Sequence, residues 1–192
     1  MKATLPFVVA LLLSCGLAAC SQEEGRVRPS SSPVSIRGYI QEIETADPAL
    51  YRLRSATTGA SEARMEIFRQ TSVVVDEFEF ASGGVAEYGA FMVLDAPPGT
   101  ATLTFTAPHV NDVKVRMTNV PENADIFLPG LILTTKGASI ADPSKVVVRV
   151  PKDGDDEAPG PVTIAGVQIP VRVAPLSELG NRREWPSPIP LR

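Results

Sequence analysis

The sequence is poor in the residues that most often carry chemistry, because its 192 residues include two cysteines and one histidine. Transition-metal sites and acid–base catalysis near neutral pH depend heavily on these side chains. Basic residues are not in excess either, since 18 Lys and Arg stand against 22 Asp and Glu. Binding that is driven by phosphate neutralisation needs the opposite balance. We therefore expect no catalytic residue, no cofactor, no metal and no nucleic-acid partner.

The chain also lacks an apolar run of the length that usually crosses a membrane, which is roughly 20 residues. Its longest apolar run extends from Leu5 to Ala19. Lys2 precedes this run, and the polar residues from Ser21 to Glu24 end it abruptly. A positive end followed by a short apolar run is typical of a signal peptide. We prefer this interpretation to a buried core helix.

The residues at the end of the apolar run resemble the lipobox of bacterial lipoproteins, because Leu17, Ala18 and Ala19 are followed at once by Cys20. The resemblance implies a signal peptide of residues 1–19 and a Cys20 that carries acyl chains such as palmitate. Two or more such chains hold a protein stably on a bilayer. By the sorting rule of enterobacterial lipoproteins, Ser21 after the cysteine favours the outer membrane over the inner membrane.

The remaining cysteine, Cys15, would leave with the signal peptide, so the mature chain would have no disulfide and would need its own apolar core. Residues 20–33 are rich in Ser, Pro, Gly and charge, which predicts a flexible tether. From Val34 onward, apolar and polar residues alternate with a period of two, as in half-buried strands. Such runs recur along the chain: 34–40, 72–80, 89–94, 102–106, 113–118, 126–135 and 146–150.

Turn residues divide these runs. The sequence Pro97-Pro98-Gly99 predicts a type II turn, with a positive φ at the glycine, and a hairpin between the runs on either side. Helical signals are few. Residues 60–70 are compatible with either a short helix or an edge strand.

The pattern resembles the carboxypeptidase regulatory-like, or transthyretin-like, domains. Their early strand with a glycine corresponds to Ile36–Ile40, their Gly-X-Phe strand to Gly89–Leu94, their turn to Pro97–Gly99 and their Thr-rich strand to Thr100–Leu103. The link between the first two segments, residues 42–71, is longer than is usual in this family. The resemblance implies an all-β fold, an antiparallel Greek-key-type β-sandwich, with no catalytic residues of its own. We expect this domain to span residues 34–150.

The last segment, residues 151–192, begins with an acidic linker that is rich in Gly and Pro. Alternation then predicts one extra strand from Val167 to Val173, at an edge of the sandwich because Pro170 cannot donate to a sheet. Pro186, Pro188 and Pro190 predict an extended tail.

Two groups of side chains are compatible with a chemical site in composition but not in spacing or motif. Residues 153–157 hold four acidic side chains, but Ala158 and Ile164 occupy the positions where a calcium loop of the EF-hand type needs Gly and Glu. His109 with Asp112 or Asp95 would need a serine nucleophile, and no Gly-X-Ser-X-Gly motif is present.

Aromatic residues offer a further alternative, because Tyr39, Tyr51, Tyr88 and Trp185 are the types that stack on sugar rings. They are sparse, since aromatics make up 6% of the chain. Trp185 lies beside Arg183, and both residue types are enriched where proteins bind each other. Docking of the tail on its own domain is the alternative for Trp185.

Together these features predict a membrane-anchored lipoprotein of the bacterial cell envelope that acts as a noncatalytic interaction or assembly module with a protein partner. The alternative is a carbohydrate-binding module of the cell surface, and an enzyme ranks third. An exposed apolar edge near Val167 to Val173 would favour strand addition to a protein. Aromatic side chains on one sheet face would favour glycan binding, and His109 beside carboxylates in a pocket would favour an enzyme.

Overall fold

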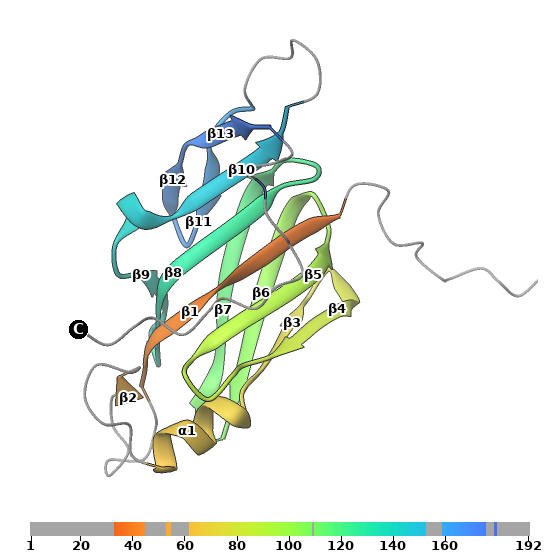
Figure 1. Ribbon diagram of the computed structural model, residues 1–192. Helices are drawn as coiled ribbons and strands as arrows, with labels where there is room; N and C mark the ends of the chain where they lie inside the picture. Colours follow the sequence, from red (N-terminus) through yellow and green to blue (C-terminus); the bar gives the residue numbers. More distant parts are fainter. Residues whose placement is uncertain are drawn as a thin grey trace, which may run out of the picture.

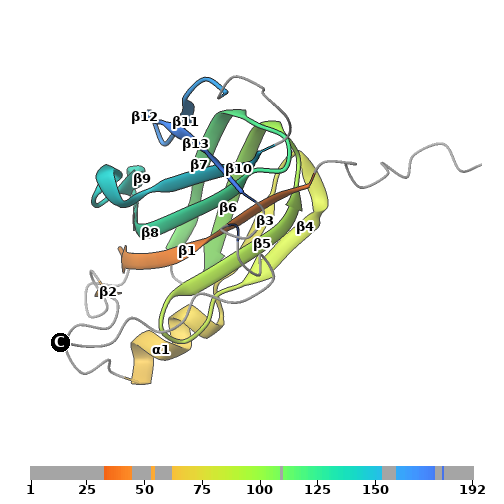
Figure 2. The same cartoon turned by 45° about the horizontal axis from the view of Figure 1, so that its top comes forward.

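In its described residues, the protein is a sandwich of two β-sheets with a short helix at one end (Figure 1). The computed structural model describes residues 33–44, 53–54, 62–108, 110–152, 159–175 and 179. Figure 2 shows the two layers from a second direction, with the strands of one sheet crossing in front of those of the other. The expected all-β sandwich is confirmed.

The first sheet, here called sheet A, has two long strands at its centre, β1 and β8, which are extended because apolar residues alternate along them. The order is β13 (Val171–Ala174), β10 (Val147–Pro151), β8 (Asp125–Thr134), β1 (Val34–Ile43) and β2 (Leu53–Arg54). In addition, β5 (Ala90–Ala96) pairs with β1, and β9 (Gly137–Ile140) pairs with β8.

The second sheet, sheet B, is antiparallel throughout its described pairings. Its order is β12 (Val167–Ile169), β11 (Val162–Ile164), β7 (Val110–Val120), β6 (Gly99–Ala107), β3 (Ser72–Val75) and β4 (Phe78–Gly84). Thus the described chain starts in sheet A with β1, alternates between the sheets through β3 and β4 in sheet B, β5 in sheet A, and β6 and β7 in sheet B, and then returns to sheet A for β8.

Two pairings in sheet A are parallel, β1 with β8 and β10 with β13. The sequence resemblance implied an antiparallel sandwich, and these two pairs depart from it. A parallel pair needs a long crossover connection. Here β3, β4, β6 and β7 separate β1 from β8, and β11 and β12 separate β10 from β13, so in both cases the chain passes through sheet B before it returns.

Two sequence predictions about turns are wrong. Residues 72–80 do not form one strand, because the chain turns at Asp76 and Glu77 and β3 pairs with β4 as a hairpin. The Pro97–Gly99 turn does not close a hairpin, since β5 before it belongs to sheet A and β6 after it belongs to sheet B. Gly99 does have the expected positive φ, at 83°. Alternation therefore located these strands without showing which sheet each would join.

The segment after residue 159 contains three strands where the sequence predicted one. Ala165 and Gly166 both have positive φ, 48° and 81°, and form the two-residue turn between β11 and β12. Pro170 stands between β12 in sheet B and β13 in sheet A, so its missing N–H falls where the chain changes sheets. The described part of this segment is thus an integral part of both sheets.

The sequence left residues 60–70 open between a short helix and an edge strand. The structure shows a helix there, α1 (Glu62–Arg69). Ile67 and Phe68 of this helix are buried. A 3₁₀ turn, η2 (Pro143–Lys145), precedes β10, and Asp142 caps it by accepting a hydrogen bond from the Ser144 N–H. The helix closes one end of the sandwich (Figure 1).

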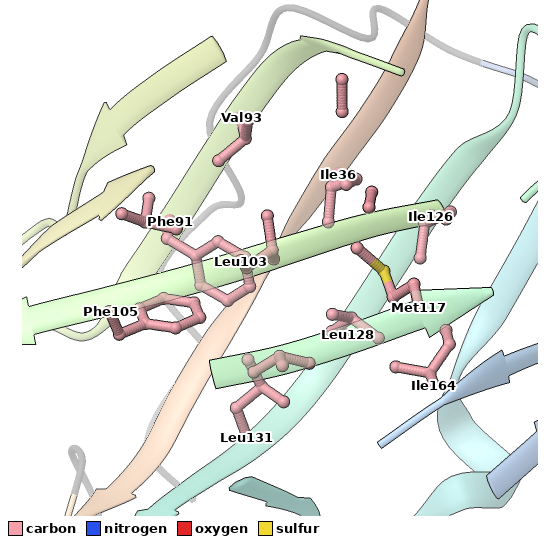
Figure 3. Packing of buried hydrophobic residues seen from close by; sticks show 14 of the residues in the cluster. Ile36, Phe91, Val93, Leu103, Phe105, Met117, Ile126, Leu128, Leu131 and Ile164 are labelled. Carbon is pink, nitrogen blue, oxygen red and sulfur yellow. The ribbon is translucent and has the colours of Figure 1, made fainter. Parts of the chain in front are cut away.

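One apolar core fills the space between the sheets (Figure 3). Phe91 of sheet A meets Phe105 of sheet B edge to face, with ring centroids 5.2 Å apart. Met117 and Leu128 continue the core toward Ile164 of β11, which points into the same cluster. The described segment 159–174 therefore contributes to the main core and is more than a surface addition.

Candidate interaction surface

Most of the residues that the sequence analysis selected for a site lie outside the described residues. These are Cys20, Tyr51, His109, the acidic residues 153–157 and Trp185. The lipidation at Cys20 and the tether therefore stay predictions. Of the remaining candidates, the structure places Tyr39, Tyr88, Asp95 and Asp112.

The two aspartates that would serve a histidine-based site do not come together. Asp95 lies near the end of β5 in sheet A, and Asp112 lies near the start of β7 in sheet B. The two residues therefore belong to different sheets, and the whole of β6 lies between them in the sequence. Asp112 accepts a hydrogen bond from the Thr106 hydroxyl at 2.9 Å. In the described part of the chain, no group of three His, Cys, Asp or Glu side chains is placed to hold a metal ion.

The described tyrosines do not form an open platform for a sugar ring. Tyr39 is 7% exposed and meets Phe127 edge to face, with ring centroids 6.1 Å apart. Burial, and then the nearby Tyr88, raise the pKa of Tyr39 above its ordinary value. Tyr88 is half-buried in the turn before β5. A stacking platform needs an exposed ring face, which Tyr39 does not offer.

The outer face of sheet B is a water-facing polar surface. The Lys114 ammonium donates to Asp76 at 2.7 Å, and the Thr104 hydroxyl donates to the same carboxylate at 2.6 Å. Beside them, the backbone N–H and hydroxyl of Thr102 each donate to Glu77 at 2.6 Å. The Lys114 bond, and then the Thr104 bond, lower the pKa of Asp76. Because these charged groups satisfy each other, this face suits solvent better than a partner.

The outer face of sheet A is different, because it carries a largely buried ion pair. An Arg37 guanidinium nitrogen lies 3.3 Å from Asp125 Oδ2, and the Asp125 side chain is 3% exposed. Among the described residues, Arg37 Nε and Asp125 Oδ1 have no hydrogen-bond partner. Sequence reasoning missed this pair, since the two residues are 88 positions apart and meet only through the parallel pairing of β1 and β8.

One edge of sheet A lies at β13, and β2 forms the other end of its strand order. Within the described strands, β13 pairs with β10 alone and stands at the end of the sheet. Val173 on this strand is 38% exposed and is the one large apolar side chain classed as exposed in the described chain. Pro170 and Pro175 flank the strand, so only residues 171–174 are available to pair. The sequence analysis stated that an exposed apolar edge near Val167 to Val173 would favour strand addition, and the exposed apolar residue of this range in the structure is Val173 on β13.

Comparison with known protein families finds no matching family, and comparison with curated proteins finds no match. In the described residues, no helix has the length and apolar character needed to cross a membrane. The two sheets define an all-β sandwich.

Proposed function

We propose that this protein is a lipid-anchored bacterial envelope lipoprotein whose sandwich acts as a noncatalytic interaction or assembly module. The lipobox-like residues that end in Cys20 support the anchor, and the free edge of β13 supports the interaction. The exposed Val173 on this edge is the observation that carries the proposal. An apolar side chain on an edge strand favours the addition of another strand beside it.

We also propose that the sandwich is a transthyretin-like domain. The two segments that carry the resemblance pair directly, because Gly38 of β1 is the register partner of Phe91 of β5. The turn at Pro97–Gly99 then leads to the Thr-rich strand β6 in the other sheet. This adjacency supports a single motif built from residues that are separated in the sequence.

The partner would add a short strand beside β13. The two prolines that flank β13 limit the pairing to residues 171–174, so the backbone bonds are few and side chains at Val173 must add to the affinity. A polar rim is already present, because Arg172 on the same strand is exposed. We therefore expect a partner segment that is extended and apolar where it meets Val173.

Val173→Lys tests this edge. A lysine on an edge strand opposes strand addition, and the substitution should leave the fold intact because Val173 is 38% exposed. After crosslinking in cells and purification of the anchored chain, we expect the yield of a defined protein partner to fall several-fold. The control is Ser139→Lys, an exposed position on the short strand β9 of the same sheet.

An equal yield of partner from Val173→Lys and the unaltered chain would contradict the β13 interface. Recovery of glycan without a protein partner would instead favour the carbohydrate-binding alternative. The melting temperatures of both variants should match that of the unaltered chain, so that a loss of partner reports on the surface and not on the fold.

A further inference from the structure

Two arginines stand opposite each other at the edge of sheet A where β13 lies beside β10 (Figure 1). Arg149 of β10 is the register partner of Arg172 of β13, and side chains paired in this way lie on the same face of a sheet. Like charges directly opposite each other destabilise a sheet. The two strands themselves contain no acidic residue that could offset this repulsion. They therefore carry an excess of positive charge at this edge.

No described carboxylate pairs with Arg172. Its side chain is exposed, and it takes part in no ion pair among the described residues. On the far side of Arg149, Asp125 of β8 is next in register, but its carboxylate lies 3.3 Å from the Arg37 guanidinium. Two strand spacings, about 10 Å, separate β8 from β13. The guanidinium of Arg172 is thus available to an acidic group from outside the described chain.

The backbone groups of β13 point alternately toward β10 and away from it. The Lys152 N–H donates to the Ala174 carbonyl at 2.9 Å, so the backbone groups of Ala174 face β10. Because this direction alternates along a strand, those of Arg172 also face β10, and those of Val171 and Val173 face the edge. Among the described strands, β13 pairs with β10 alone. Two residues therefore offer one N–H donor and one C=O acceptor each to an added strand.

The side chains on the two faces of β13 differ in character. Val173 is the register partner of Val150, which is buried in the core, so Val173 lies on the core side of the sheet where the sandwich ends. Arg172 lies on the opposite face, because successive side chains of a strand alternate between faces. A strand added beside β13 would therefore meet an apolar side chain on one face and a guanidinium on the other.

We propose that the partner of the β13 edge is an extended segment in which apolar and acidic residues alternate, with an apolar side chain beside Val173 and a carboxylate beside Arg172. Such a carboxylate makes a charge-assisted hydrogen bond with the guanidinium and offsets the repulsion between Arg149 and Arg172. This inference rests on the proposed function, which assigns the edge, and adds the chemistry of the segment that binds there. A second copy of this chain fits less well, because its own β13 brings another arginine and no carboxylate.

Binding of short synthetic peptides to the full, detergent-solubilised chain tests this pattern. The first probe alternates glutamate and valine, and the second alternates lysine and valine. The third has the composition of the first, with all its valines grouped at one end. Fluorescence anisotropy of a dye on each peptide measures the dissociation constant. We expect the first probe to bind several-fold more tightly than the other two, and its advantage over the second should shrink as the salt concentration rises.

Arg172→Glu tests the charge separately from the edge. This variant should reverse the preference, so that the lysine–valine probe binds several-fold more tightly than the glutamate–valine probe. Arg116→Glu is the matched control, because it makes the same change of charge at an exposed position on the outer face of sheet B. The control should keep the preference of the unaltered chain.

Equal binding of the first two probes would overturn the proposal, and so would an Arg172→Glu variant that keeps the preference of the unaltered chain. Equal binding of the first and third probes would also overturn it, because the site would then recognise negative charge without the alternation of a strand. Capture of the partner in cells separates this failure from that of the proposed function. Loss of the partner in Val173→Lys but not in Arg172→Glu would overturn the acidic segment alone, and retention in both variants would contradict the edge itself.

Discussion

At the scale of single residues, the contact between β1 and β8 depends on Gly38. A Cβ built at this position would lie 2.1 Å from the Leu128 carbonyl oxygen, which is backbone and cannot rotate away. Gly38→Ala should therefore push the two central strands of sheet A apart. We expect a loss of unfolding free energy at the upper end of the roughly 1–3 kcal/mol that overpacking costs, measured by urea unfolding.

Gly84→Ala is the matched control, since nothing lies within 4 Å of a Cβ at Gly84 in β4. The change in its free energy of unfolding should stay within about 1 kcal/mol. An alanine that fits without a clash also lowers the conformational entropy of the unfolded chain, which favours the folded state. Equal losses in the two variants would show that the β1–β8 contact does not need the glycine.

The Asp76–Lys114 pair predicts a pH effect. The hydrogen bond from Lys114, and then the one from Thr104, lower the pKa of Asp76 in the folded protein. The stability that this carboxylate contributes is therefore present above its ordinary pKa of about 3.9 and is lost as pH falls through the folded value. The contribution is small, because the pair is largely exposed.

We expect Asp76→Asn to be slightly less stable than the unaltered protein at pH 7 and to lose less stability as the pH falls below about 4. Urea unfolding at several pH values measures both. If the two proteins lose stability in parallel over this range, the Asp76 carboxylate contributes nothing that depends on pH.

The sequence predicted backbone features correctly where they depend on a single residue and its neighbours in the chain. Gly99 has the positive φ that its turn requires, and Pro170 stands where no sheet bond is needed. The Arg37–Asp125 pair was not predictable, because its two members come from strands that are remote in the sequence and pair in parallel. The burial of Tyr39 was not predicted either, since the sequence offered this residue only as an aromatic ring that could stack on a sugar.

At the scale of elements, the short strands after residue 159 are the main test of the architecture. Ile164 of β11 is fully buried in the core shared with Met117. Ile164→Ala should therefore cost about 2–5 kcal/mol of the free energy of unfolding and lower the single main transition. Thr163→Ala, which changes the half-exposed neighbour on the same strand, should cost much less.

An unchanged main transition in Ile164→Ala, measured by thermal or urea unfolding, would mean that β11 to β13 fold apart from the sandwich.

The positions of most strands could be predicted from the sequence, because apolar residues recur at every second position where one face of a strand is buried. The sequence did not show how strands group into sheets, since β5 and β6 share a turn yet join different sheets. Those choices depend on packing between distant parts of the chain.

At the scale of the whole molecule, the two broad faces differ in their polar groups. Sheet B presents a face of paired charges and hydroxyls to solvent, and sheet A carries the buried side chains of Ser35, Tyr39 and Asp125 on its outer face. The free edge at β13 lies at the border of sheet A, with Val173 exposed. This asymmetry, together with the predicted anchor at Cys20, is the basis of our proposal that the protein is a module that stays at a membrane surface and binds a partner with one edge.

The measurement that tests this account most directly is membrane fractionation of cells that express the unaltered chain, Cys20→Ser or Cys15→Ser. We predict that the unaltered chain and Cys15→Ser stay with the membranes, because only Cys20 follows the lipobox-like residues. Cys20→Ser should move to the soluble fraction or stay uncleaved without added lipid mass. A Cys20→Ser chain that is cleaved and membrane-bound like the unaltered chain would contradict the lipid anchor and, with it, the assignment to the envelope surface.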